Sequence, residues 1–218
     1  MQAEIITIGD ELLIGQVVDT NSAWLGRTLG EDGIKVTQIT SIQDDADQIS
    51  RTVNEALARV SIVLVTGGLG PTRDDITKHT LAELFGMRLV RDEQVYETVR
   101  RQLAVRGIAF NELNRGQALV PDGCTVLPNR NGTAPGMWFE RGGKILVSMP
   151  GVPFEMKALV TDEVLPRLRT HFSLHANVHR TAITFGLAES ILAERIAPWE
   201  AALPANLRLA YLPSALCI

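Results

Sequence analysis

The feature that most constrains the fold is a regular alternation of strand-like and helix-like segments. Three runs rich in β-branched residues are each followed by a stretch in which apolar residues recur at helical spacing. The runs are residues 3–9, 34–42 and 61–68, and the helical stretches are residues 21–33, 44–60 and 74–86. Such alternation implies a mostly parallel sheet with helices on both of its faces. We therefore predict an α/β fold.

The rest of the chain divides into a continuation of this layer and a smaller unit. Residues 93–107 and 153–168 are expected to be helical, and residues 125–151 to form short strands with a hairpin turn at Gly142 and Gly143. The first domain is thus predicted to span residues 1–170. Residues 171–218 are expected to form a partial α+β unit, with strands at 181–187 and 207–213 around a helix at 188–203. Its apolar ending suits an interrupted domain.

Charge and apolar content exclude several classes of protein. The 25 acidic and 21 basic residues form no long block of one sign, so a nucleic-acid partner is not expected. No apolar run is long enough to span a membrane, and the N-terminus lacks the pattern of a signal peptide. We therefore expect a cytoplasmic protein without a membrane partner. The two cysteines have no metal-type spacing, which argues against a structural zinc site.

Acidic residues follow three of the predicted strands. The first strand ends before Asp10, the second before Asp44 and Asp45, and the third before a loop that contains Asp75. In an open parallel sheet the ligand crevice lies beyond the carboxyl ends of the strands, so these side chains should converge. Two carboxylates 4 Å apart repel by about 4 kcal/mol at an effective dielectric near 20, which a divalent cation, a shared proton or a basic partner would offset. The alternative is that each aspartate is a helix N-cap, which contributes about 1 kcal/mol.

The loop TGGLGPTRDD, residues 66–75, combines glycines with carboxylates. It lacks the Gly-Lys-Ser/Thr ending of a P-loop, and it does not match GxGxxG. Glycine amides near a helix N-terminus bind phosphate, and a bound metal would make neighbouring carboxylates compatible with that anion. Two further loops, at residues 129–138 and 148–156, also follow strands and are expected to line the pocket. Their alternative role is that of purely structural Pro-Gly turns.

Four segments resemble the N-terminal domain of the CinA family (competence/damage-inducible protein A), which is related to molybdopterin-binding proteins. They are GDELLIGQVVDTNSAWL, TGGLGPTRDDIT, NGTAPG and MPGVPFEM, and the resemblance covers residues 1 to about 170. It implies a three-layer α/β/α molybdopterin-binding-like fold. It also implies ADP-ribose pyrophosphatase activity that depends on a divalent metal, Co²⁺ or Mg²⁺, and is aided by K⁺. By similarity to the molybdopterin adenylyltransferases, Asp75 matches an essential aspartate, and Asp44 or Asp45 falls near a second one.

These two lines of argument lead to a hypothesis for the site. Asp10, Asp44 and Asp75 are predicted to hold the metal and to act in catalysis, while Arg73 or Lys78 neutralises developing charge. The products would be AMP and ribose 5-phosphate. The predicted substrate-binding residues are Gly67, Gly68, Gly70, Pro71, Thr72, Asp74, Thr77, Gly132, Thr133, Gly136, Pro150, Gly151 and Glu155.

Two other functions stay open at this point. The same pocket would suit a molybdopterin- or nucleotide-binding domain that transfers an adenylyl group. It would equally suit a non-catalytic nucleotide-binding module of a larger protein with nicotinamide-mononucleotide amidohydrolase activity. The resemblance of these 218 residues does not include the amidohydrolase domain of the family. A homodimer is expected, because the C-terminal unit is apolar.

Overall fold

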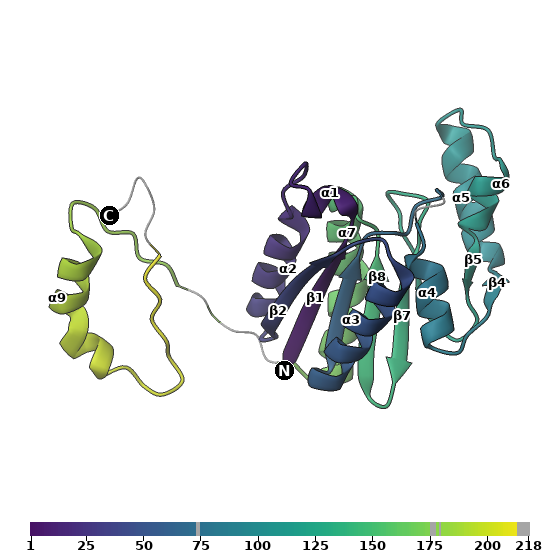
Figure 1. Ribbon diagram of the computed structural model, residues 1–218. Coiled ribbons are helices and arrows are strands. Elements are labelled where there is room, and N and C mark those ends of the chain that lie inside the picture. Colours follow the sequence, from purple (N-terminus) through teal and green to yellow (C-terminus); the bar gives the residue numbers. More distant parts are fainter. Residues whose placement is uncertain (73–74, 175–177, 179, 213–218) are drawn as a thin grey trace. The chain divides into compact units, whose positions relative to one another are not determined.

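The computed structural model of the chain describes residues 1–72, 75–174, 178 and 180–212. The chain divides into two compact units, Met1–Asn177 and Val178–Ile218 (Figure 1). The family resemblance ends near residue 170, whereas the last helix of the first unit, α8 (Leu165–Phe172), continues two residues further. Each unit is described by itself below.

The first unit is built on a six-stranded sheet in the order β2-β1-β3-β8-β7-β6. Four strands are parallel to one another: β1 (Gln2–Ile8), β2 (Lys35–Ile42), β3 (Ile62–Thr66) and β8 (Lys144–Met149). The strands β7 (Gly136–Arg141) and β6 (Thr125–Leu127) continue the sheet in antiparallel register. The predicted mostly parallel sheet is confirmed.

The hairpin between β7 and β8 turns where the sequence predicted it. Gly142 has φ 59° and Gly143 has φ 74°. A two-residue hairpin turn of this kind requires positive φ at both central positions, which glycine adopts without steric cost.

Helices cover both faces of the sheet, which gives the three predicted layers (Figure 1). Alternate residues of β1 face opposite cores, so that Ile5 packs with α2 (Thr20–Glu31) and α7 (Pro153–Leu159), whereas Ile6 packs with α3 (Ala46–Arg59) and α4 (Thr77–Leu84). This alternation follows from the period of two in a strand. A π-helical segment, Val160–Val164, joins α7 to α8, so helix continues from Pro153 to Phe172.

A small lobe lies between α4 and β6 in the chain. It consists of β4 (Leu89–Arg91), α5 (Glu93–Val105), α6 (Glu112–Gly116) and β5 (Leu119–Pro121), with β4 and β5 antiparallel. A core of its own holds it together, which includes Val99 and Leu103 of α5. We call residues 89–121 the α5–α6 lobe. Of its elements, the sequence predicted only the α5 helix.

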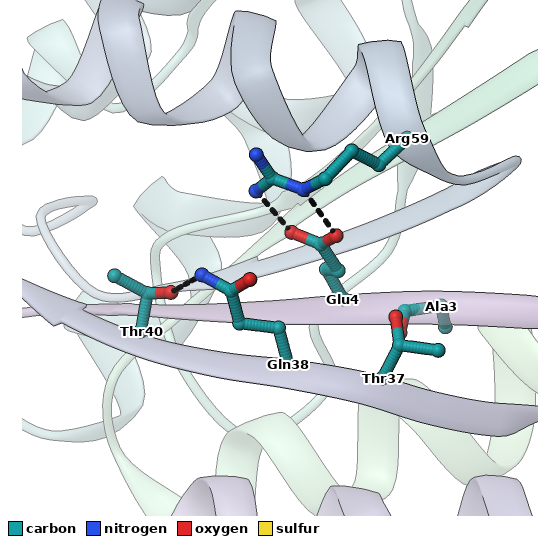
Figure 2. Close-up of polar contacts among 6 residues, drawn as sticks. All are labelled: Ala3, Glu4, Thr37, Gln38, Thr40 and Arg59. Atoms are coloured by element: carbon teal, nitrogen blue, oxygen red, sulfur yellow. Dashed lines mark hydrogen bonds and ion pairs between the residues drawn. The ribbon is translucent and has the colours of Figure 1, made fainter.

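An ion pair between a buried glutamate and an exposed arginine fixes α3 to β1. Glu4 lies on β1 with its side chain only 4% exposed, and Arg59 is the last residue of α3. Nε and Nη2 of Arg59 donate to the two carboxylate oxygens of Glu4, each at 2.8 Å (Figure 2). Because a buried carboxylate is costly unless it is paired, this bidentate contact explains how a glutamate is accommodated in an otherwise apolar strand.

The start of one predicted helix is corrected by the structure. The helix expected to open on the acidic pair near residue 74 begins instead at Thr77, and its N-cap Ile76 provides no side-chain cap. The reason is that the carboxylate of Asp75 turns back to accept hydrogen bonds from Thr72.

Within residues 178 and 180–212, the second unit contains one helix, α9 (Glu189–Ala201), in which no residue is buried. The strands expected at 181–187 and 207–213 are absent from the described residues of this unit. A strand is stable only when its backbone groups are paired with a neighbouring strand, and none pairs with these segments in the described part of the chain. Among the described residues, every helix is too short or too polar to cross a membrane.

Candidate functional site

A cleft of about 570 Å³ opens at the carboxyl ends of β1, β3 and β8. This is the position at which an open α/β sheet binds its ligands. Its lining combines glycine-rich loops with four carboxylates and one guanidinium. The residues are Ile8, Gly9, Glu11, Asp44, Gly67, Gly68, Leu69, Gly70, Pro71, Asp75, Arg106, Gly132, Thr133, Ala134, Pro150, Gly151, Val152 and Glu155.

Two glycines of the loop after β3, Gly67 and Gly68, are packed so closely that neither position tolerates a side chain. A Cβ at Gly67, where φ is +117°, would collide with the carbonyl oxygen of Ile8 at the end of β1. A Cβ at Gly68, where φ is +63°, would collide with the hydroxyl of Thr77 and lie 2.9 Å from Oδ1 of Asp44. These two glycines therefore let the loop pass between β1, α4 and Asp44, which leaves its backbone at the cleft.

Asp75 shapes the second half of this loop. Its Oδ2 accepts hydrogen bonds from the backbone N–H of Thr72 at 2.9 Å and from the Thr72 hydroxyl at 2.5 Å. The same carboxylate lies against the α-carbon of Gly70, where it leaves no room for a Cβ. Asp75 is thus half-buried, lines the cleft and fixes the loop.

The structure separates the roles of the two aspartates that follow β2. Asp45 is the N-cap of α3 and accepts a hydrogen bond from the backbone N–H of Gln48 at 2.8 Å. Asp44 lines the cleft beside Gly68. Of the two candidates, Asp44 is the one that lies at the site, while the neighbouring residue satisfies the helix terminus.

Asn129 organises the loop that forms another wall of the cleft. Its Oδ1 accepts from the backbone N–H groups of Asn131 and Gly132, each at 3.0 Å. Its Nδ2 donates to the carbonyl of Ala134 at 2.9 Å and to Oε2 of Glu155 at 2.7 Å. This buried amide therefore ties the loop of residues 129–134 to the first turn of α7.

Two polar contacts hold the loop that follows β8. The Thr66 hydroxyl donates to the carbonyl of Pro150 at 2.8 Å, and Nδ2 of Asn21 donates to the carbonyl of Gly151 at 2.7 Å. These bonds link the end of β3 and the start of α2 to the cleft wall. The loop after β8 is thus tied both to the sheet and to α2.

Most of the predicted site residues are brought together. Eleven of them line the cleft: Asp44, Asp75, Gly67, Gly68, Gly70, Pro71, Gly132, Thr133, Pro150, Gly151 and Glu155. These residues come from four separate loops of the sequence, and the sheet edge makes them neighbours.

The remaining predicted residues lie elsewhere. Asp10 is exposed in the first turn of α1 (Asp10–Leu13), outside the cleft lining. Thr77 is fully buried behind Gly68, and Gly136 is buried in β7, where a Cβ would collide with Leu159. Thr72 reaches the site through its hydrogen bonds to Asp75. Arg73 and Asp74 lie outside the described residues.

The carboxylates of the cleft do not by themselves form a complete metal site. Within the described ranges, no group of three or more histidine, cysteine, aspartate or glutamate side chains is placed to hold a metal ion. The predicted combination of Asp10, Asp44 and Asp75 is therefore not assembled by the protein alone. The donor set does suit a hard cation that takes one or two carboxylates and completes its shell with water and ligand phosphate oxygens.

Lys78 does not line the cleft. It is only 8% exposed, and its Nζ donates to the carbonyl of Gly116 in the α5–α6 lobe at 2.7 Å. Burial lowers the pKa of this ammonium to about 8, while the negative charge of Asp75 acts in the opposite direction.

Three polar residues of the site are absent from the predicted set. One is Glu11, which lines the cleft one position after the predicted Asp10. Arg106 lines the cleft from the end of α5, and Asn129 supports it from within the wall. Arg106 follows an amphipathic helix as an ordinary surface residue would, so the sequence carries no signal for it. Asn129 begins the loop NRNGTAPG, and its position before a Pro-Gly turn is the one signal that could have identified it.

Comparison with known proteins agrees with this architecture. Residues 4–170 match the family model described as "Probable molybdopterin binding domain". A molybdopterin biosynthesis protein from Mycobacterium abscessus has the same fold, with 18% identity, a TM-score of 0.54 and coverage of 79% of this chain and 94% of that chain. The first unit thus defines a protein of the molybdopterin-binding-like α/β class.

The relatives narrow the assignment. A CinA-like protein of Cytophaga hutchinsonii is 50% identical over 98% of this chain and 51% of its own length. The crystal structure of the protein CinA, described as of unknown function, from Thermoplasma acidophilum matches with 36% identity and a TM-score of 0.68, covering 73% of this chain and 94% of that one. The chain belongs to the CinA-like family. It spans about half the length of the curated relatives it matches.

Proposed function

We propose that the cleft binds ADP-ribose, or a similar nucleoside diphosphate sugar, and hydrolyses its pyrophosphate bond to AMP and ribose 5-phosphate with the help of a divalent metal. One observation carries this proposal. Asp44 and Asp75 lie in the same cleft as the closely packed backbone of Gly67, Gly68 and Gly70. Such a combination suits a ligand that brings both phosphate and a cation.

The glycine loop is suited to contact the diphosphate. Gly67, Gly68 and Gly70 line the cleft and carry no side chain. Further along the same connection, α4 begins at Thr77 with no side-chain cap on its first turn. Helix N-termini attract anions because their backbone N–H groups are unpaired and the helix dipole is positive there. We infer that the diphosphate lies along residues 67–70.

The carboxylates are proposed to serve a cation, Co²⁺ or Mg²⁺, together with the ligand. When bound, such an ion withdraws charge from phosphoryl oxygens and lowers the pKa of a coordinated water. Asp44 and Asp75 would hold it, with Glu11 or Glu155 orienting water at the same cleft. Because Oδ2 of Asp75 already accepts two hydrogen bonds from Thr72, we assign the ligand-side contact to Oδ1.

Release of AMP from ADP-ribose tests the proposal, measured with Co²⁺, with Mg²⁺ and with a chelator. Asp44→Asn and Asp75→Asn should each lower metal-dependent turnover by about 100-fold or more, because removing a charge that stabilises the transition state costs several kcal/mol. Asp45→Asn is the matched control, since asparagine is an equally good N-cap and this residue is the helix cap. Unchanged turnover in both cleft variants would refute the assignment.

A second candidate function is favoured by the match of residues 4–170 to a molybdopterin-binding-type domain. In this alternative the cleft binds a pterin or nucleotide and transfers an adenylyl group, or only binds it as a module of a longer protein. Binding of AMP or molybdopterin, measured by calorimetry, without release of AMP from ADP-ribose under any metal condition, would favour it over hydrolysis.

A further inference from the structure

We propose that Arg106 recognises the phosphate of the cleft's ligand, so that the α5–α6 lobe supplies the cationic side of an otherwise acidic site. This inference rests on the proposed function in one respect, namely that the ligand carries phosphate. It adds a specificity residue that lies outside the glycine-rich and acidic loops.

The charge distribution of the cleft is the first observation. Its described lining carries four carboxylates, those of Glu11, Asp44, Asp75 and Glu155, and the guanidinium of Arg106 as its single basic group. A ligand with several negative charges would be repelled by this lining unless a cation faced it. Lys78 does not fill that role, because its ammonium is directed to the carbonyl of Gly116.

The position of the guanidinium is the second observation. Nη2 of Arg106 donates to the carbonyl of Asn131 at 3.0 Å, and that residue immediately precedes Gly132 and Thr133 of the cleft wall. One turn earlier, Nε2 of Gln102 donates to the carbonyl of Asn129 at 3.1 Å. The end of α5 is thus fixed to the loop, which holds Arg106 at the rim.

The bonding of Arg106 leaves its charge uncompensated. A carbonyl is a neutral acceptor, and Arg106 forms no ion pair with any of the described residues. A guanidinium has five N–H donors in a planar fork that fits phosphate in a bidentate manner. The arrangement therefore offers an exposed, positioned cation, and the described lining of the cleft contains no other basic side chain.

A purely structural role makes a different prediction. If Arg106 only fastened α5 to Asn131, its loss would lower the stability of the lobe and weaken charged and uncharged ligands alike. If it contacts phosphate, the loss is specific to charged ligands. The comparison of AMP, adenosine and inorganic pyrophosphate therefore separates the two roles.

The experiment measures the affinity of the full chain for these three probes by calorimetry in Arg106→Gln, Arg106→Lys and Arg101→Gln. Arg101 is an exposed residue of the same helix that does not line the cleft, so its variant makes the same change in net charge. Arg106→Gln should lower the affinity for AMP and for pyrophosphate by about 10-fold or more, as expected for the loss of a charge-assisted contact. The affinity for adenosine should stay within about 2-fold of that of the unmodified chain. Arg106→Lys should recover part of the loss, and Arg101→Gln should bind normally.

Equal weakening of all three probes, or unchanged AMP and pyrophosphate affinity, would overturn the inference while leaving the proposed hydrolysis intact. Failure of the unmodified chain to bind either phosphate probe would contradict the proposed function itself. Urea unfolding of each variant identifies any loss of affinity that arises from unfolding.

Discussion

The side-chain amide of Asn129 donates to the carboxylate of Glu155 at 2.7 Å and thereby joins two walls of the cleft. Asn129 is 6% exposed. Its side-chain amide also accepts two hydrogen bonds from backbone N–H groups of the loop and donates one to a loop carbonyl. The Glu155 carboxylate in turn fills the space beside Gly132 where a Cβ would lie. The geometry of this wall therefore depends on the amide donor of Asn129.

Asn129→Asp is expected to destabilise the protein by about 1–3 kcal/mol, because it leaves the carbonyl of Ala134 without a donor and places two carboxylates together. Urea unfolding measures the loss. Asn131→Asp, a change of the same chemistry in the same loop at a half-buried side chain, is the control and should cost less. Equal effects of the two substitutions would contradict the role given to Asn129.

Gly68→Ala is expected to damage the site beyond the cost of its backbone conformation. Gly68 has φ +63°, and Gly86 has φ +68° with no atom within 4 Å of the position of its Cβ. Both substitutions carry the left-handed penalty of roughly 1–2 kcal/mol, but only the one at Gly68 also collides with Thr77. We expect Gly68→Ala to lower stability by at least about 1 kcal/mol more than Gly86→Ala, and to weaken AMP binding.

Denaturant unfolding and AMP calorimetry of the two variants check this. The double variant Gly68→Ala/Thr77→Ala should recover part of the stability, since it removes the hydroxyl with which the new methyl collides. If the two single variants were equally stable and bound AMP equally, the close packing of the loop would have no consequence.

The buried Lys78 should make stability depend on pH in the alkaline range. Its pKa falls from 10.5 to about 8 on folding, so between these values the unfolded chain binds a proton that the folded chain does not. Stability therefore rises as the pH increases through this window, by up to about 3 kcal/mol, and the contribution is constant below pH 8.

The variant Lys78→Met isolates this contribution. As the pH increases from 8 to 10, the unfolding free energy of the unmodified chain should increase relative to that of the variant. The lost hydrogen bond to Gly116 adds an offset that does not vary in the same way, because a neutral amine also donates. A difference that stays constant over this range would contradict the lowered pKa.

Metal binding is expected to require the nucleotide. Since the described side chains provide no preformed group of three ligands, Co²⁺ or Mg²⁺ alone should bind weakly, whereas AMP should strengthen metal affinity by about 10-fold or more through its phosphate oxygens. Calorimetric titration of each metal with and without AMP measures this coupling. Tight binding in the absence of nucleotide would instead point to a complete protein site.

Much of the fold followed from local pattern. The β-branched runs at residues 3–9 and 61–68 predicted β1 and β3 because buried parallel strands need continuous apolar side chains, and Gly142-Gly143 predicted its turn because both positions need positive φ. The prediction of two C-terminal strands was wrong, because alternating apolar residues form a strand only where a partner strand is present. The predicted homodimer, the K⁺ dependence and the domain boundary at residue 170 stay predictions.

The candidate site was predictable as a set of loops, but its internal order was not. The sequence by itself determined that glycines and acidic residues follow the strands, and the carboxyl ends of parallel strands are where an open α/β sheet binds its ligands. Only the tertiary structure decided that Asp45 caps a helix while Asp44 lines the cleft, and that Arg106, from a lobe distant in sequence, joins them. The physical reason is that a helix cap is satisfied locally, within three residues, whereas a cleft is formed by side chains whose approach depends on the packing of whole layers.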